Sequence, residues 1–192
     1  EPSSELRCPR TEKSFVGKHL VLSGGARGLG AALAESLLAD GYAISTFSRN
    51  RTDSIDYLSR IGGDQCFYRE LDITSDGLDV FVKQAIEQNG PIYGVINNAA
   101  IVQEGILATL PEVEIESMTA VNLTGAIRLT RLALRTMIQR QGGRILNISS
   151  ILGTRGYNGL AVYSASKAWL DGFKRSLARV IGRKGITVNA VA

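Results

Sequence analysis

Short apolar runs alternate along the chain with longer segments whose apolar residues recur at helical spacing. Runs typical of buried strands occupy residues 19–23, 42–48, 66–71, 93–97, 144–149 and 186–191. Segments with helical spacing occupy residues 31–38, 55–61, 77–89, 113–141 and 161–183, and we expect an internal break in the fourth. Strands that alternate with helices are typical of a parallel sheet covered on both faces. The pattern predicts a Rossmann-like, doubly wound α/β fold with three layers.

One domain accounts for this pattern. The chain has 192 residues, 44% of them hydrophobic, which is enough for one sizeable core. Residues 1–17 are polar and lack periodicity, so we interpret them as a leader or linker and residues 18–192 as the domain. No run of 18 apolar residues and no secretory signal is visible. These features predict a cytoplasmic protein without a membrane partner.

Charge and cysteine content exclude several other classes of protein. The net charge is +4, but the basic residues are dispersed and lack interleaved aromatic residues, which argues against a nucleic-acid partner and still suits a phosphorylated ligand. Cys8 and Cys66 have no metal-ligand spacing, so we expect reduced, structural thiols. His19, the lone histidine, has no acidic or cysteine cluster around it, and we expect it at the surface or a strand edge. No metal site is predicted.

A glycine-rich turn joins the first strand to the first helix. Residues 23–30 read Ser-Gly-Gly-Ala-Arg-Gly-Leu-Gly, and the amide groups of such a turn, with the helix N-terminus, can meet a pyrophosphate. The spacing Gly-x-x-x-Gly-x-Gly differs from the Gly-x-Gly-x-x-Gly dinucleotide fingerprint, so a purely structural turn remains an alternative. The position after a strand and before a helix favours phosphate binding.

Tyr163 and Lys167 stand four residues apart in the last helical segment, so both side chains project from one face. A fixed ammonium beside a phenol favours the phenolate, which makes proton exchange near neutral pH possible. Tyrosine and lysine also fall at this spacing on many surface helices without any function. The pair is therefore an acid/base candidate whose weight depends on the other motifs.

Five motifs in order support that candidate, namely Ser23 to Gly30, Asn97-Asn98-Ala99-Ala100, Asn122, Ser150, and Tyr163 with Lys167. Together they resemble the motifs of the short-chain dehydrogenase/reductase family across residues 18–192. The segments Gly-Gly-Arg-Ile-Leu-Asn-Ile-Ser-Ser and Gly-Ile-Thr-Val-Asn-Ala-Val-Ala resemble 3-oxoacyl-[acyl-carrier-protein] reductases and related ketoreductases. The resemblance implies an oxidoreductase acting on a carbonyl or secondary-alcohol substrate, which includes acyl thioesters.

The resemblance also implies the roles of four catalytic residues. Tyr163 donates the proton to the carbonyl oxygen, and Ser150 hydrogen-bonds that oxygen. Lys167 holds the nicotinamide ribose, and Asn122 breaks its helix and holds a water that links Lys167 to solvent. The alternative function is a catalytically silent NADP(H)-binding module of the same fold, which the intact set of four residues disfavours.

Charge at the end of the second strand predicts the cofactor. An NAD-specific fold carries a carboxylate there, but this chain has Ser48 followed by Arg49, and Arg27 lies in the glycine turn. Two guanidinium groups can pair with the 2′-phosphate of NADP(H), which is therefore the expected cofactor. The alternative is that Arg49 merely faces solvent.

The complete set of predicted cofactor contacts is Ser23, Gly24, Arg27, Gly28, Leu29, Gly30, Ser48, Arg49, Asp72, Ile73, Asn98, Ala99, Tyr163 and Lys167. By resemblance Asp72 contacts the adenine, although an aspartate beginning a helix is equally an N-cap. Ala100 stands where the family has glycine, a mild change unless the backbone there needs a positive φ.

By resemblance the family continues beyond Ala192 into a Pro-Gly turn, a loop over the substrate and a final strand. We therefore expect the C-terminal strand and substrate loop to lie outside this chain, either because the chain is part of something longer or because it is truncated. That loop selects the substrate, so the sequence leaves the substrate open. The resemblance further implies a homodimer or homotetramer.

Overall fold

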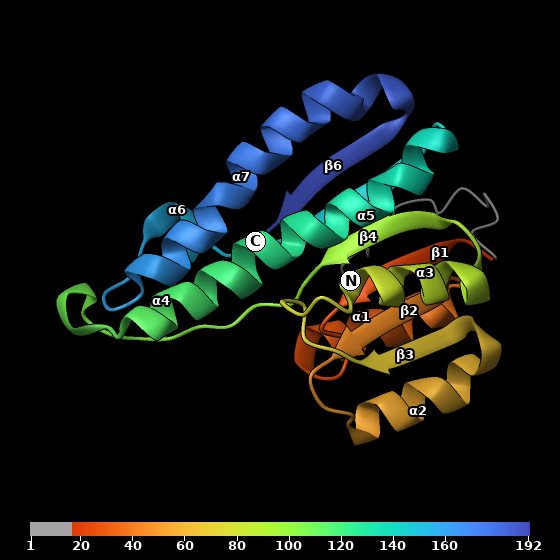
Figure 1. The fold of residues 1–192 in the computed structure, drawn as a ribbon, viewed down its shortest axis with the longest axis horizontal. Coiled ribbons are helices and arrows are strands. Elements are labelled where there is room, and N and C mark those ends of the chain that lie inside the picture. The colour runs from red at the N-terminus through yellow and green to blue at the C-terminus, as the bar shows by residue number, and fades with distance from the viewer. Residues whose placement is uncertain (1–16) are drawn as a thin grey trace, which may run out of the picture.

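The computed structural model describes residues 17–192, which form a six-stranded sheet between two layers of helices (Figure 1). All neighbouring strands are parallel, in the order β3-β2-β1-β4-β5-β6. The strands are β1 (His19–Ser23), β2 (Ala43–Ser48), β3 (Cys66–Glu70), β4 (Ile92–Asn97), β5 (Gly143–Ile148) and β6 (Ile186–Val191). The predicted doubly wound α/β fold is confirmed. The predicted leader lies outside the described residues except for Gly17.

Two apolar cores hold the helices to opposite faces of the sheet. On one face α1 (Gly28–Ala39) and α2 (Asp53–Gly62) pack around Leu22 and Ile44. On the other face α3 (Leu78–Asn89), α5 (Ala126–Gln139) and α7 (Ala161–Ile181) pack around Val21 and Val95. Right-handed crossovers explain this division, because the chain winds toward β3 in its first half and toward β6 in its second.

The reversal of winding lies between β1 and β4, which are neighbours in the sheet although β2 and β3 separate them in sequence. The loops that follow these two strands diverge onto opposite faces. Ligands of open parallel sheets bind in the crevice that this divergence leaves beyond the carboxyl ends of the strands. The fold thus directs attention to the segments after Ser23 and Asn97.

The predicted break in the long helix at 113–141 is a change of helix type rather than an interruption. α4 (Glu112–Thr119) continues through a π-helical turn (Ala120–Gly125) directly into α5. Single π turns inside helices occur frequently at functional sites. Short elements absent from the prediction are α6 (Leu152–Arg155) and the 3-10 turns Gly63–Gln65 and Leu107–Thr109. The predicted helix 161–183 is α7 followed by a 3-10 turn, Gly182–Lys184.

His19 does not lie at the surface, and that expectation was wrong. It opens β1, a strand with neighbours on both sides, and it is only 1% exposed. The ring is accommodated because Nδ1 contacts the Gly90 carbonyl at 2.7 Å and Nε2 contacts the Ser45 hydroxyl at 2.7 Å. A buried polar ring is tolerated when both nitrogens have partners.

Three further expectations from the sequence concern the cysteines, a metal site and a membrane-spanning segment. Cys66 is buried and free, whereas Cys8 lies outside the described residues. Between residues 17 and 192, His, Cys, Asp and Glu side chains form no group of three or more suited to a metal ion. None of the helices in that range has both the length and the apolar character needed to cross a bilayer.

Candidate active site

The glycine-rich turn follows β1 and forms the N-terminus of α1. Gly24 and Gly28 have positive φ angles of 75° and 53°, which favour glycine at both positions. A Cβ at Gly30 would overlap the carbonyl oxygen of Gly24, so the turn and the helix approach closely. No side chain caps α1, whose N-cap residue is Arg27. The N–H groups at the start of α1 are thus available to an anion.

Ser23 and Asn98 join the two loops that diverge at the switch point. The Ser23 hydroxyl accepts hydrogen bonds from the backbone N–H groups of Asn98 and Ala99, both at 3.0 Å. The Asn98 amide donates in turn to the carbonyls of Ser23 and Gly24, at 3.0 and 3.1 Å. Ser23 is 1% exposed, so it supports the loops that line the crevice rather than lining it itself.

Two threonines that the sequence analysis did not single out also hold the turn. The Thr46 hydroxyl accepts from the Gly25 N–H at 3.1 Å and donates to the Leu22 carbonyl at 2.7 Å. The Thr52 hydroxyl donates to the Ala26 carbonyl at 2.7 Å. Their partners lie 21 to 26 residues away, and no local pattern of the sequence identifies such contacts.

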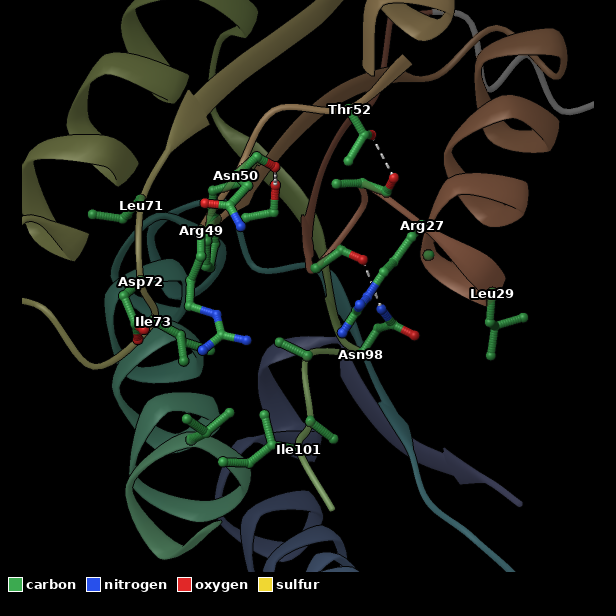
Figure 2. A pocket seen from close by; sticks show the side chains of 18 residues that line it. Arg27, Leu29, Arg49, Asn50, Thr52, Leu71, Asp72, Ile73, Asn98 and Ile101 are labelled. Carbon is green, nitrogen blue, oxygen red and sulfur yellow. Dashed lines mark hydrogen bonds between the residues drawn. The ribbon is translucent and has the colours of Figure 1, made fainter. Parts of the chain in front are cut away.

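A cavity of about 280 Å³ opens beside the turn (Figure 2). Predicted cofactor contacts that line it are Gly24, Arg27, Leu29, Gly30, Ser48, Arg49, Asp72, Ile73, Asn98 and Ala99. Lining residues that were not predicted are Ala26, Phe47, Asn50, Thr52, Leu71, Ala100, Ile101 and Val121. Gly28, Tyr163 and Lys167 lie outside this wall. The structure therefore gathers most of the predicted contacts around one space.

Two arginines supply the positive charge of this cavity, whose wall also contains the Asp72 carboxylate. Figure 2 shows the side chains of Arg27 and Arg49 extending from opposite sides of the cavity toward its middle. Within residues 17–192 neither guanidinium makes a hydrogen bond or salt bridge. Guanidinium groups without protein partners, facing a cavity together, suit a phosphate.

Asp72 is not the N-cap of the following helix, so that alternative was wrong. α3 begins at Leu78, and its N-cap residue is Gly77. The Asp72 carboxylate instead accepts hydrogen bonds from the N–H and hydroxyl of Thr74, at 2.8 and 2.7 Å. It stabilises the turn after β3 and forms part of the cavity wall.

Ala100 fits its position without strain. Among residues 17–192 the only residue other than glycine with a positive φ is Gln141. The backbone at Ala100 therefore makes no demand for glycine, and its methyl group simply adds to the cavity wall.

Lys167 and Tyr163 lie on one face of α7, as the spacing predicts. The Lys167 Nζ lies 5.8 Å from the centre of the Tyr163 ring and donates to the Ile148 carbonyl, at the end of β5, at 2.8 Å. Lys167 is 5% exposed, and this burial lowers the pKa of its ammonium below the usual value for lysine. The amine is thus held in place and releases its proton more readily than a surface lysine.

Asn122 ties this part of α7 to the loop after β4. It lies in the π-helical turn, where its amide oxygen accepts from the Ile101 N–H and its amide nitrogen donates to the Ile101 carbonyl, both at 2.8 Å. The same nitrogen donates to the Ser166 hydroxyl at 3.0 Å, and Ser166 donates to the Tyr163 carbonyl at 2.7 Å. Ser166, which the sequence analysis missed, thus links Asn122 to the tyrosine.

Ser150 follows β5, and its hydroxyl accepts from the Leu152 N–H at 3.2 Å. Ser150 and Lys167 share the wall of a second, smaller cavity of about 60 Å³. Tyr163 lines neither cavity, and its hydroxyl makes no hydrogen bond with another residue in the range 17–192. The structure thus brings Ser150, Lys167, Tyr163 and Asn122 to one edge of the sheet, and no described residue hydrogen-bonds the phenol.

Known proteins match this chain over nearly the whole of the described fold. The family model described as short chain dehydrogenase matches residues 18–192. The human 3-oxoacyl-[acyl-carrier-protein] reductase is 36% identical over 178 residues, which are 92% of this chain and 75% of the relative. The Vibrio cholerae protein of that name is 34% identical over 183 residues, 93% of this chain and 73% of the relative. A crystal structure of a Streptomyces avermitilis short-chain dehydrogenase superposes with a TM-score of 0.85 at 31% identity, and the match covers 90% of this chain and 64% of that one.

Proposed function

This chain belongs to the short-chain dehydrogenase family, and from that premise we propose that it transfers a hydride between NADP(H) and a carbonyl or secondary-alcohol carbon. Ketoreduction is the proposed direction, and 3-oxoacyl thioesters are the proposed substrate class. Two relatives that bear the name 3-oxoacyl-[acyl-carrier-protein] reductase support this substrate class.

One observation carries the proposal, namely the convergence of Asn122, Ser150, Tyr163 and Lys167 at the carboxyl edge of the sheet. Burying an amine costs free energy, and here Lys167 is buried one helical turn from a phenol that has no protein partner among the described residues. A module that only binds a cofactor could use Lys167 to hold the ribose, but it has no use for a phenol without a hydrogen-bond partner one helical turn away. Catalytic turnover is therefore favoured over the silent binding module.

The cavity beside the glycine turn fits the proposed cofactor by the chemistry of its donors. The N-terminus of α1 offers N–H groups to a pyrophosphate, and Arg27 and Arg49 offer guanidinium groups to a 2′-phosphate. Asp72 and Ile73 lie in the wall where an adenine would be held. Lys167 would hold the nicotinamide ribose.

The four residues then divide the remaining chemistry. NADPH held beside the glycine turn would supply the hydride for the carbonyl carbon. Tyr163 donates its phenolic proton to the carbonyl oxygen, while Ser150 hydrogen-bonds that oxygen and stabilises its developing negative charge. The Lys167 ammonium stabilises the phenolate left on Tyr163. Asn122, through Ser166 and the Tyr163 carbonyl, keeps α7 in register with the loop after β4.

The proposed activity is tested by following the absorbance of NADPH with a panel of 3-oxoacyl thioesters and simple ketones. We expect oxidation of NADPH that depends on the substrate, with the 3-oxoacyl thioesters turned over fastest. Tight NADPH binding with no turnover of any carbonyl compound would instead favour the silent module. Sedimentation of the purified protein tests the expected homodimer or homotetramer. The distribution of the protein within the cell tests the expected cytoplasmic location.

Replacing Arg49 with alanine is expected to reduce the preference for NADPH over NADH. The variant loses a charge-assisted hydrogen bond to the 2′-phosphate, and the exposure of Arg49 puts the effect at about 10-fold in the ratio of the two KM values. Arg60→Ala is the matched control, because Arg60 lies on α2 over the Tyr57 ring, outside the cavity. An unchanged ratio in Arg49→Ala would remove Arg49 from the cofactor site.

A further inference from the structure

The turn after β2 is anchored to β3 on both sides of Arg49. Before it, the Ser48 carbonyl accepts from the Leu71 N–H at 2.9 Å. After it, the Arg51 N–H donates to the Glu70 carboxylate at 2.8 Å, and the Arg51 guanidinium lies 5.5 Å from the centre of the Tyr68 ring. The Arg51 guanidinium is also paired with the Asp56 carboxylate at 2.7 Å. Because Arg51 is already paired, Arg49 is the arginine of this turn that is left to meet a phosphate.

The Ser48 hydroxyl has a single proton, and its position follows from its two partners. It lies 2.8 Å from the Asn50 carbonyl, which can only accept, so the Ser48 proton points there. It also lies 2.9 Å from the Tyr68 hydroxyl. Because the Ser48 proton is already used, Tyr68 must donate in this second bond. The hydrogen bonds therefore run in one direction, from Tyr68 to Ser48 to the Asn50 carbonyl.

Tyr68 is suited to this donor role over a wide range of pH. It projects from β3 and is partly buried, and burial raises the pKa of its phenol above the usual value. The phenol therefore stays protonated. The bonds from Tyr68 and Ser48 fix the backbone between residues 48 and 50, and Arg49 lies between these fixed points with its side chain in the cavity (Figure 2).

On the basis of the proposed NADP(H) function, we propose that Tyr68 is a positioning residue for recognition of the cofactor 2′-phosphate. It acts through Ser48 by holding the turn that presents Arg49. Ser48 itself is then a link in this chain of hydrogen bonds rather than a donor to the phosphate, since its only proton is committed to Asn50. Tyr68 does not line the cavity, so it makes no direct contact with a phosphate bound there.

Binding of two nucleotides that differ only in the 2′-phosphate tests this proposal. Adenosine 2′,5′-bisphosphate and adenosine 5′-monophosphate are titrated calorimetrically into the wild type, Tyr68→Phe, Ser48→Ala and the double variant. Tyr68→Phe keeps the ring under Arg51 and removes only the hydroxyl. We expect it to lower the preference for the bisphosphate about 3- to 10-fold, the effect of one hydrogen bond, with little change for the monophosphate.

Comparison among the variants tests whether Tyr68 acts through Ser48. Ser48→Ala removes both the bond from Tyr68 and the bond to Asn50, so we expect a loss at least as large as that of Tyr68→Phe. If Tyr68 acts through Ser48, the double variant is no worse than Ser48→Ala alone. A further loss in the double variant would show that Tyr68 acts independently of Ser48 and would overturn the proposal. Tyr57→Phe is the matched control, because Tyr57 is exposed on α2 and its hydroxyl donates to the Glu35 carboxylate, at 2.9 Å and outside the cavity.

The outcomes also distinguish a failure of the proposed role of Tyr68 from a failure of the proposed NADP(H) preference. A wild type that binds both nucleotides equally well refutes the NADP(H) preference and, with it, the role of Tyr68. A wild type that prefers the bisphosphate, together with Tyr68→Phe of unchanged preference, leaves the cofactor intact and refutes the role of Tyr68 alone. Equal weakening of both nucleotides in Tyr68→Phe refutes it as well, because a general loss of structure gives that result.

Discussion

Replacing Tyr163 with phenylalanine is expected to lower kcat by about 100- to 10,000-fold, the usual contribution of a general acid or base. The variant keeps the ring, so α7 keeps its packing and Lys167 keeps its neighbour at 5.8 Å. Only the phenolic hydroxyl is lost, and with it the proton that Tyr163 donates in the proposed mechanism. Binding of NADPH, measured by fluorescence titration, is expected to stay close to that of the wild type.

The control for this variant is Tyr157→Phe. Tyr157 lies in the loop before α7 and is 66% exposed, so loss of its hydroxyl is expected to leave kcat unchanged. Single-turnover measurements place the loss in the chemical step rather than in product release. Turnover by Tyr163→Phe at the wild-type rate would contradict the mechanism, even if the oxidoreductase activity itself were demonstrated.

Acidification is expected to destabilise the folded protein through His19, at the end of the sheet opposite the candidate site. The Gly90 carbonyl can only accept, so Nδ1 carries the proton and Nε2 accepts from the Ser45 hydroxyl. Asn89 donates to the same hydroxyl at 3.1 Å. This arrangement accommodates a neutral imidazole, and a second proton has no acceptor within it.

Burial lowers the pKa of His19 from 6.5 to about 4, although the hydrogen bond to Gly90 opposes the shift. The unfolded chain therefore binds a proton at a higher pH than the folded chain. The contribution of His19 to stability is complete above about pH 6.5 and is lost as the pH falls toward 4. A shift of this size corresponds to about 3 kcal/mol of unfolding free energy.

Urea unfolding between pH 8 and pH 4.5 measures this effect when the wild type is compared with His19→Gln. Carboxylates titrate in the same range in both proteins, so the difference between the two curves isolates the histidine. We expect His19→Gln to be the less stable protein at pH 8 and to lose less stability on acidification. Parallel curves would show that His19 does not couple folding to pH.

Local sequence patterns identified the elements better than they identified the environment of individual side chains. The run that begins at His19 was correctly predicted as a strand, yet the histidine was expected at the surface or a strand edge. Its partners are Ser45 on the neighbouring strand and Gly90, which lies 71 residues along the chain. Polarity gave the wrong answer because burial of a polar ring depends on partners that only the packing of β1, β2 and α3 supplies.

The motif residues were likewise predicted from the sequence, whereas the residues that contact them were not. Arg27 and Arg49 were predicted from their places after strands and Asp72 by resemblance, and the parallel sheet brings the ends of those strands to one edge. The residues that hydrogen-bond motif positions, among them Tyr68 at Ser48 and Ser166 at Asn122, carry no local signal. A tyrosine in a strand or a serine in a helix has many roles, and only the hydrogen bonds to Ser48 and Asn122 distinguish these two.

By itself the sequence determined the order of strands and helices, the glycine-rich turn and the membership of a family, because apolar periodicity and motif spacing are local properties of the chain. Tertiary structure alone decided which hydroxyl supports which loop, that His19 is buried, and that Asn122 joins the loop after β4 to α7. The physical reason is that a hydrogen bond depends on the relative position of two groups to within fractions of an ångström. For groups dozens of residues apart, that position is set by the packing of the whole sheet and its helices.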